Sequence, residues 1–175
     1  ALAKAAEAVK NAKGDYAGKA VTDLVPVNLS DNTALNTAAQ NLLDAANSDY
    51  ATADDLKNAK SAYENAKTAA ETALRTSTAD AKTAQTNIAK NLASDTDVMA
   101  ANDKLQKLLD APETSTKTAI DDAVKALTNA ETAAEATLAA AKDSAAKNMP
   151  DTKPVSKETQ VINAKTALEN AIKDG

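Results

Sequence analysis

Apolar residues recur every three or four positions along most of the chain, which is the spacing of one face of an α-helix. The pattern predicts short helices over 1–13 and 33–47, long helices over 52–93 and 97–148, and a C-terminal helix over 157–173. No comparable stretch alternates residue by residue, as a half-buried strand would. The chain is therefore predicted to be all-helical.

The helix over 52–93 has the clearest pattern, because no Gly or Pro interrupts it and Thr52 can cap its start. Its inward positions alternate by three and four up to Ala73 and then continue from Leu74, shifted by one residue. Such a shift in a heptad pattern locally unwinds a coiled coil.

Three segments interrupt the helical pattern. Residues 14–32 hold two of the three Gly and also Pro26, and are predicted as a loop that can include one helical turn. Pro112 either kinks the helix over 97–148 or begins a second helix there. Pro150 and Pro154 bracket a predicted turn before the C-terminal helix.

The composition favours a long, thin molecule. Alanine is abundant, while the chain has no Phe or Trp and only three Tyr, so large core side chains are scarce. We expect one elongated domain over 1–175, built as an antiparallel three-helix bundle with a fourth helix over part of its length. The helices over 52–93 and 97–148 would lie antiparallel, with the N-terminal helices of 1–47 and the C-terminal helix packed on them. A homodimer that supplies the missing layer is the competing geometry.

The charge of the chain argues against two classes of partner. The net charge is −5, and acidic and basic residues are interspersed. An acidic chain lacks the basic surface of a nucleic-acid-binding protein. No apolar run approaches the roughly 20 residues needed to cross a bilayer, and no basic amphipathic face is present. We expect neither nucleic-acid binding nor direct membrane insertion by this segment.

The chain also lacks the usual residues of catalysis. Without His or Cys it can form neither a Ser–His–Asp triad nor a thiol nucleophile, and a zinc site is not expected. The three Gly do not form a phosphate-binding loop. The acidic pairs Asp95–Asp97 and Asp121–Asp122 are interpreted as helix caps and solvated surface. We predict no catalytic residue, no cofactor, no metal ligand, and therefore no enzyme.

Candidate protein-binding residues lie in the predicted loops. Tyr16 and Tyr50 lie at helix breaks, where tyrosines can anchor interfaces or simply cover a helix end. Pro26 belongs to the long loop over 14–32, and long loops are often functional. Asn28 begins an Asn-Leu-Ser triplet, which matters only in a eukaryotic secretory route. Tyr63, by contrast, lies on the inner face of its helix and is predicted to be core.

Two stretches carry a resemblance to known proteins. Residues 48–66 (SDYATADDLKNAKSAYENA) and 166–172 (TALENAI) resemble the FIVAR helical modules of surface proteins in Gram-positive bacteria and mycoplasmas. The shared features are a Tyr in the turn, a Leu-x-x-Ala helix start and alanine-rich helices. The chain is also similar to the alanine-rich surface coat proteins of insect-stage trypanosomes. Both resemblances imply an elongated helical bundle displayed outside the cell.

We therefore expect a cell-surface helical module for protein contact, such as an adhesin, a receptor or a coat or spacer protein. Its ligand would be an unidentified protein, with host proteins among the candidates. The chain begins at Ala1, so we expect a processed or shortened chain whose export signal or anchor lies outside it. The alternative is an intracellular coiled-coil scaffold, which would form stable homo-oligomers.

Overall fold

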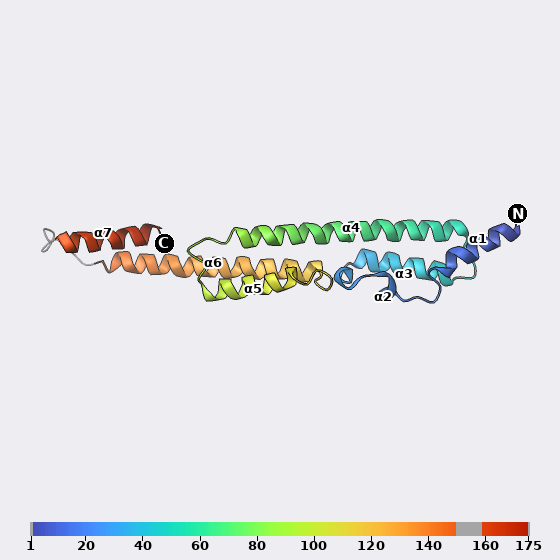
Figure 1. The fold of residues 1–175 in the computed structure, drawn as a ribbon, viewed down its shortest axis with the longest axis horizontal. Helices are drawn as coiled ribbons and strands as arrows, with labels where there is room; N and C mark the ends of the chain where they lie inside the picture. Colours follow the sequence, from blue (N-terminus) through green and yellow to red (C-terminus); the bar gives the residue numbers. More distant parts are fainter. Residues whose placement is uncertain (1, 150–158, 175) are drawn as a thin grey trace.

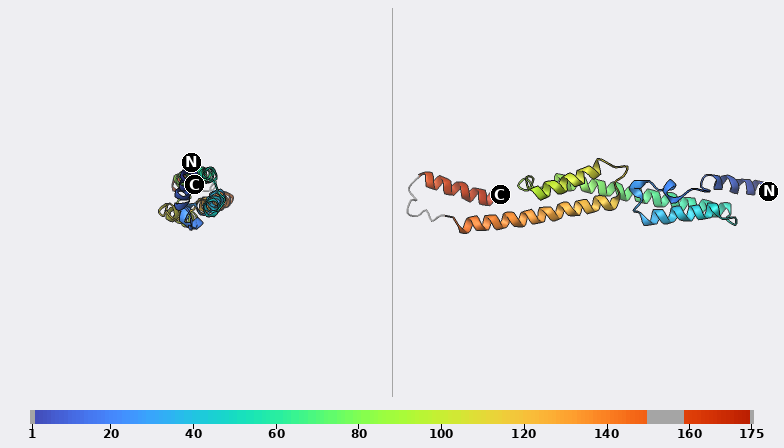
Figure 2. Two further views of the ribbon diagram at one scale, coloured as in Figure 1. Left: turned by 90° about the vertical axis from the view of Figure 1, so that its right-hand side faces the viewer. Right: turned by 90° about the horizontal axis from the view of Figure 1, so that it is seen from below.

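The computed structural model describes residues 2–149 and 159–174, and every regular element in these ranges is helical. The prediction of an all-helical chain is confirmed. The elements form a long rod that is narrow when viewed along its axis (Figures 1 and 2). They are α1 (Leu2–Gly14), α2 (Val21–Leu24), the 3-10 helix η1 (Val27–Leu29), α3 (Thr33–Asn47), α4 (Ala53–Thr86), α5 (Thr96–Leu109), α6 (Lys117–Lys147) and α7 (Thr159–Asp174).

At the starts of α3, α4, α5 and α6, polar side chains accept hydrogen bonds from backbone N–H groups that have no intrahelical acceptor. The start of α4 is a capping box: Asp55 N donates to Thr52 Oγ1 at 3.2 Å, and Thr52 N donates to Asp55 Oδ2 at 2.9 Å. This confirms the predicted cap at Thr52. The other capping side chains are Asn32 for α3, Asp95 for α5 and Thr116 for α6.

The helix predicted over 52–93 is shorter in the structure, where α4 ends at Thr86. The chain then turns, and Leu92 folds back to become 2% exposed in the core, with Ile88 half-buried beside it. A turn can bury these side chains as well as a helix can. Their helical spacing therefore led to the wrong prediction that the helix continues to residue 93.

Of the two alternatives at Pro112, the structure shows a second helix, so a single helix over 97–148 is wrong. The second helix begins at Lys117 and not at Pro112 itself. The chain forms α5 and α6 there, and Pro112 lies in the turn between them. Proline has no N–H to donate and disfavours helix at the residue before it, so the helix stops at Leu109. The loop predicted over 14–32 is present and contains one α-helical turn, α2, followed by η1.

The helices contact one another in three successive groups along the rod (Figure 1). The first unit consists of α1, α3 and the first half of α4, together with α2, η1 and the loop around them, which also pack on the first core. The second unit consists of the second half of α4, α5 and the first half of α6. The C-terminal pair consists of the second half of α6 and α7. The helices α4 and α6 are therefore each shared between neighbouring groups, and no single bundle runs the length of the chain.

The predicted antiparallel arrangement of the two long helices is also wrong. In Figure 1, α4 and α6 run in the same direction, because the chain reverses before α5 and again after it. The antiparallel neighbours are α3 with α4, α4 with α5, α5 with α6, and α6 with α7.

The buried residues form two separate cores, and the half-buried Leu74 of α4 packs against both. The shift in the apolar pattern at Leu74 thus falls where α4 exchanges one set of partners for the next. The fully buried side chains include Leu35 and Leu42 in the first core, and Val98, Leu105 and Leu127 in the second.

The predicted C-terminal helix over 157–173 corresponds to α7, which the structure describes from Thr159 to Asp174. The predicted turn at Pro150 and Pro154 lies outside the described residues.

Candidate functional site

The three candidate protein-binding residues differ in exposure. Tyr50 is 94% exposed in the turn between α3 and α4. Tyr16 is half-buried against the first core, and Lys19 Nζ lies 5.9 Å from the centre of its ring. Pro26 is exposed and immediately precedes η1. Of the three, Tyr50 is the side chain most open to a partner, whereas Tyr16 also serves packing.

The loops that carry Tyr16 and Tyr50 lie side by side. Gly18 N donates to Asn47 Oδ1 at 3.2 Å, and the Lys13 side chain donates to the carbonyl of Ser48. Pro26 lies beyond the opposite end of α3, a helix of 15 residues and hence about 22 Å long. The structure therefore brings Tyr16 and Tyr50 to one end of the first unit and Pro26 to the other.

Tyr63 is part of the first core and is 9% exposed, as predicted. Its hydroxyl donates to the carbonyl of Leu24 at 2.7 Å, so its polar end is satisfied. Burial, followed by the nearby Tyr16 and Glu71, raises the pKa of the Tyr63 hydroxyl. This tyrosine is thus a structural link between α4 and α2.

Polar contacts join the first unit to the second, and they were not foreseen from the sequence. Asp31 Oδ2 accepts from Thr118 N in the first turn of α6 at 2.7 Å. Asn28 Nδ2 donates to the carbonyl of Pro112 at 3.0 Å. The amide of the predicted glycosylation triplet is thus half-buried and engaged in a hydrogen bond within the protein. No local sequence pattern could pair residues more than 80 positions apart.

The contact at Asp31 changes its acidity. Partial burial raises the pKa of its carboxyl, but hydrogen bonds from Thr118 and Thr116 outweigh that effect and hold the pKa below the ordinary 3.8. Charged acceptors near a helix N-terminus are also favoured by the helix dipole. The ionised form of Asp31 therefore stabilises the junction between the two units.

Within the second unit, a buried hydroxyl joins α4 to α6. Ser77 is 6% exposed, and its Oγ donates to Asp121 Oδ1 at 2.6 Å. Lys117 pairs with the other oxygen of Asp121. Burial raises the pKa of Asp121, but the bonds from Lys117 and Ser77 together lower it below its ordinary value. Asp121, predicted to be solvated surface, thus has a packing role between helices.

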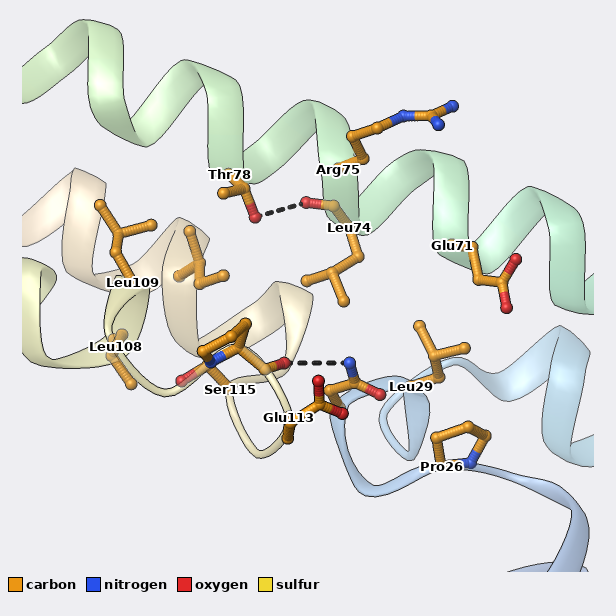
Figure 3. Close-up of a pocket in the computed structure, with 13 residues that line it drawn as sticks. Pro26, Leu29, Glu71, Leu74, Arg75, Thr78, Leu108, Leu109, Glu113 and Ser115 are labelled. Carbon is orange, nitrogen blue, oxygen red and sulfur yellow. Dashed lines mark hydrogen bonds between the residues drawn. The ribbon is translucent and has the colours of Figure 1, made fainter.

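A pocket of about 440 Å³ lies at the junction between the two units (Figure 3). Leu29 from η1 and Leu74 from α4 line it from opposite sides and point toward one another, whereas the guanidinium end of Arg75 points away. Glu71 and Glu113 also line it. The other apolar residues that line it are Pro26, Leu108, Leu109, Pro112 and Ile120. The pocket marks the gap between the two cores, and Pro26 is the one predicted site residue that reaches it.

The described part of the chain contains no group of three or more His, Cys, Asp or Glu residues that could hold a metal ion. In the same residues, no buried side-chain polar atom lacks a hydrogen-bond partner. In this part of the chain, the buried polar groups are thus engaged in hydrogen bonds within the protein and are not gathered into a metal-binding cluster.

The most informative feature missed in the sequence is an internal repeat. Most inward positions of α4 have a counterpart 64 positions later in α6, and the repeat begins with the capping residues Thr52 and Thr116. The paired residues are Leu56 and Ile120, Ala59 and Ala123, Tyr63 and Leu127, Ala70 and Ala134, Leu74 and Leu138, and Ala81 and Ala145. Self-similarity at a fixed period is the sequence mark of stacked repeat units.

The helices before α4 and α6 also resemble one another, at an offset of 66 rather than 64 positions, because two fewer residues separate the matching segment from the cap of the next helix. The segment Ala39–Ala45 (AQNLLDA) of α3 corresponds to Leu105–Ala111 (LQKLLDA), which spans the end of α5 and the start of the next turn. Ala39 and Leu105 are both fully buried. Comparing the chain with itself would have revealed this period, whereas scanning it for chemical motifs could not.

Among the described residues, no helix is both long enough and apolar enough to cross a membrane. No protein-family model, curated protein or solved structure matches the chain.

Proposed function

We propose that this chain is a non-catalytic helical rod displayed at the cell surface. There it either binds another protein or acts as a spacer that holds a binding region away from the cell. The observation that carries the proposal is the sharing of α4 and α6 between neighbouring groups of helices. A shared helix replaces a flexible linker, so the rod resists bending between groups. At 1.5 Å per residue, the 34 residues of α4 extend about 51 Å.

The finer architecture belongs to the same proposal. We infer that each unit acts as an antiparallel three-helix module and that modules can be stacked along one axis without loss of register. In repeat proteins each unit contacts only its neighbours, which allows length to vary while the fold is kept. Such a design suits a spacer or coat protein, and also an adhesin whose binding end must clear the cell surface.

For an adhesin or receptor, the proposed contact surface is the end of the first unit that carries Tyr50 and Tyr16. An exposed tyrosine offers a large amphipathic surface, and tyrosines are enriched at the energetic centres of interfaces. The partner would be a protein, with host proteins among the candidates. Pro26 remains a second proposed contact residue, at the junction pocket.

Surface display is tested by antibody labelling of intact cells that produce the protein, compared with permeabilised cells. Labelling of intact cells is expected. Labelling only after permeabilisation would contradict surface display. Protein contact is tested by saturable binding of the immobilised chain to solubilised cell-surface proteins, with Tyr50→Ala as the variant. Met99→Ala is the matched control, since Met99 is 50% exposed in the second unit, away from Tyr50.

The second candidate function is an intracellular scaffold that assembles through its helices. It is favoured by the half-covered apolar face of α7, which includes Leu168 at 37% exposure. Sedimentation equilibrium discriminates between the two readings. A stable homo-oligomer at low micromolar concentration favours the scaffold, whereas a monomer at high concentration favours the displayed rod.

A further inference from the structure

The C-terminal pair lacks one of the helices that complete the first two units. In the second unit, the second half of α4 and α5 are both covered by the first half of α6. In the C-terminal pair, the second half of α6 and α7 contact each other, and no third described helix packs there (Figures 1 and 2). The open surface of these two segments, 138–147 and 161–172, is called the open face below.

The residues of α7 repeat those of α5 but are less buried. Val98 and Leu105 of α5 are 1% and 0% exposed. Their counterparts 63 positions later are Val161, which is half-buried, and Leu168, which is 37% exposed. The same apolar positions are therefore present in α7 without the cover that α6 gives them in the second unit.

The second half of α6 shows the same difference when it is compared with α4. Ser77 and Ala81 of α4 are 6% and 0% exposed. Their counterparts 64 positions later are Ala141, which is exposed, and Ala145, which is half-buried. Small residues at these positions allow a neighbouring helix to approach closely, as α6 does at Ser77 through its Asp121.

We propose that the open face binds a helix with the apolar register of the first halves of α4 and α6, supplied by a further repeat unit of the same kind. That register places Leu or Ile four residues after a Thr cap, Tyr or Leu at eleven, and Ala at seven and eighteen. The occupant is assigned from this chain itself, because such a helix covers the equivalent face in the second unit. This binding depends only on the open face and the helix, so it is independent of whether the protein lies at the cell surface or inside the cell.

The test uses the full chain and a synthetic peptide of residues 114–135, which carries the cap and the first half of α6. Titration of the fluorescently labelled peptide with the full chain should show saturable binding. The helical signal in circular dichroism should increase as the peptide binds. Amide exchange should slow in α7 and in residues 138–147. Absence of binding at about 1 mM peptide, which corresponds to a free energy near −4 kcal/mol, would overturn the proposal.

Variants of the peptide avoid any effect on folding of the chain. Leu127→Asp in the peptide removes the side chain that is fully buried in the second unit, and should weaken binding at least about tenfold. Thr128→Asp is the control, because Thr128 is exposed in that unit, and it should bind as the parent peptide does. Equal binding by all three peptides would contradict the proposed face.

Variants of the chain test the location and the register. Leu168→Asp should abolish binding, whereas Ile162→Asp, at a position 45% exposed and equivalent to the exposed Met99, should not. Ala141→Ser restores the hydroxyl that meets Asp121 in the second unit, and should tighten binding severalfold. Unchanged or weaker binding by this variant would contradict the register. A homodimer that Leu168→Asp dissociates, without peptide binding by the parent chain, would assign the face to a second copy instead.

Discussion

Asp31 Oδ2 accepts a hydrogen bond of 2.7 Å from Thr118 N, so a loop of the first unit caps the helix that begins in the second. The contact adds to the cap that Thr116 gives to the same helix. Because Leu74 is the one described side chain that packs on both cores, polar contacts at the surface of the junction help to fix the angle between the units.

Removal of this inter-unit cap should loosen the junction. We expect Asp31→Ala to lower the free energy of unfolding by about 0.5–1 kcal/mol, the lower part of the usual range for a cap because Asp31 is exposed. Urea unfolding followed by circular dichroism measures the loss. Asp80→Ala, an exposed position in α4, is the control and should have a smaller effect. An equal loss in both variants would contradict a specific role for Asp31.

Acid should destabilise the chain by protonating the carboxyl groups of Asp31 and Asp121. Asp31 and Asp121 both have a pKa below 3.8 in the folded chain. Their contribution to stability is complete above the unfolded-state pKa and is lost as the pH falls through the folded-state pKa. We expect the Tm to change little between about pH 7 and pH 5 and to fall below about pH 4. A double Asp31→Ala, Asp121→Ala variant should show a shallower fall in calorimetry.

Ser77 should be needed for close packing of α4 on α6. Ser77→Ala removes a donor to Asp121 while keeping a small side chain, and should cost about 1 kcal/mol of unfolding free energy. It should also raise the pKa of Asp121, which NMR titration of the carboxyl carbon reports. Ser61→Ala, at an exposed position of the same helix, should change neither quantity.

Loss of the hydroxyl should matter at Tyr63 of α4 and not at Tyr50 in the preceding turn. Tyr63→Phe removes the bond to the carbonyl of Leu24 and should lower the unfolding free energy by about 1 kcal/mol. Tyr50→Phe should leave stability unchanged, since Tyr50 is 94% exposed. Comparable effects in thermal unfolding would show that the buried hydroxyl is not a stabilising link.

A deletion that respects the repeat should shorten the rod without unfolding it. Deletion of residues 67–130 removes 64 positions and joins Ala66 to Glu131, so that Ala134 takes the place of Ala70. We expect a cooperative helical protein that is shorter in small-angle X-ray scattering. Deletion of residues 67–128 is the control, because it would place Thr132 at the buried position of Ala70 and should lower the Tm. Equal stability of the two deletions would contradict the repeat.

Local signals in the sequence determined the class of the fold and most helix starts. The alternation of apolar residues by three and four specifies helices, and the cap at Thr52 was predicted because its bonds close within three residues. The inward position of Tyr63 follows from the same periodicity. The period of 64 between α4 and α6 was present in the sequence and would have predicted stacked units.

Only the tertiary structure decided where each helix ends and which face meets which partner. Leu92 continues the apolar spacing of α4 but lies in a turn. Burying its side chain stabilises the fold equally well whether the backbone is helical or not, so the spacing alone does not specify a helix. The direction of α6 depends on two chain reversals around α5, and periodicity within a helix carries no information on direction. The junction contacts of Asp31 and Asn28 join residues more than 80 positions apart, so only the packed rod brings them together.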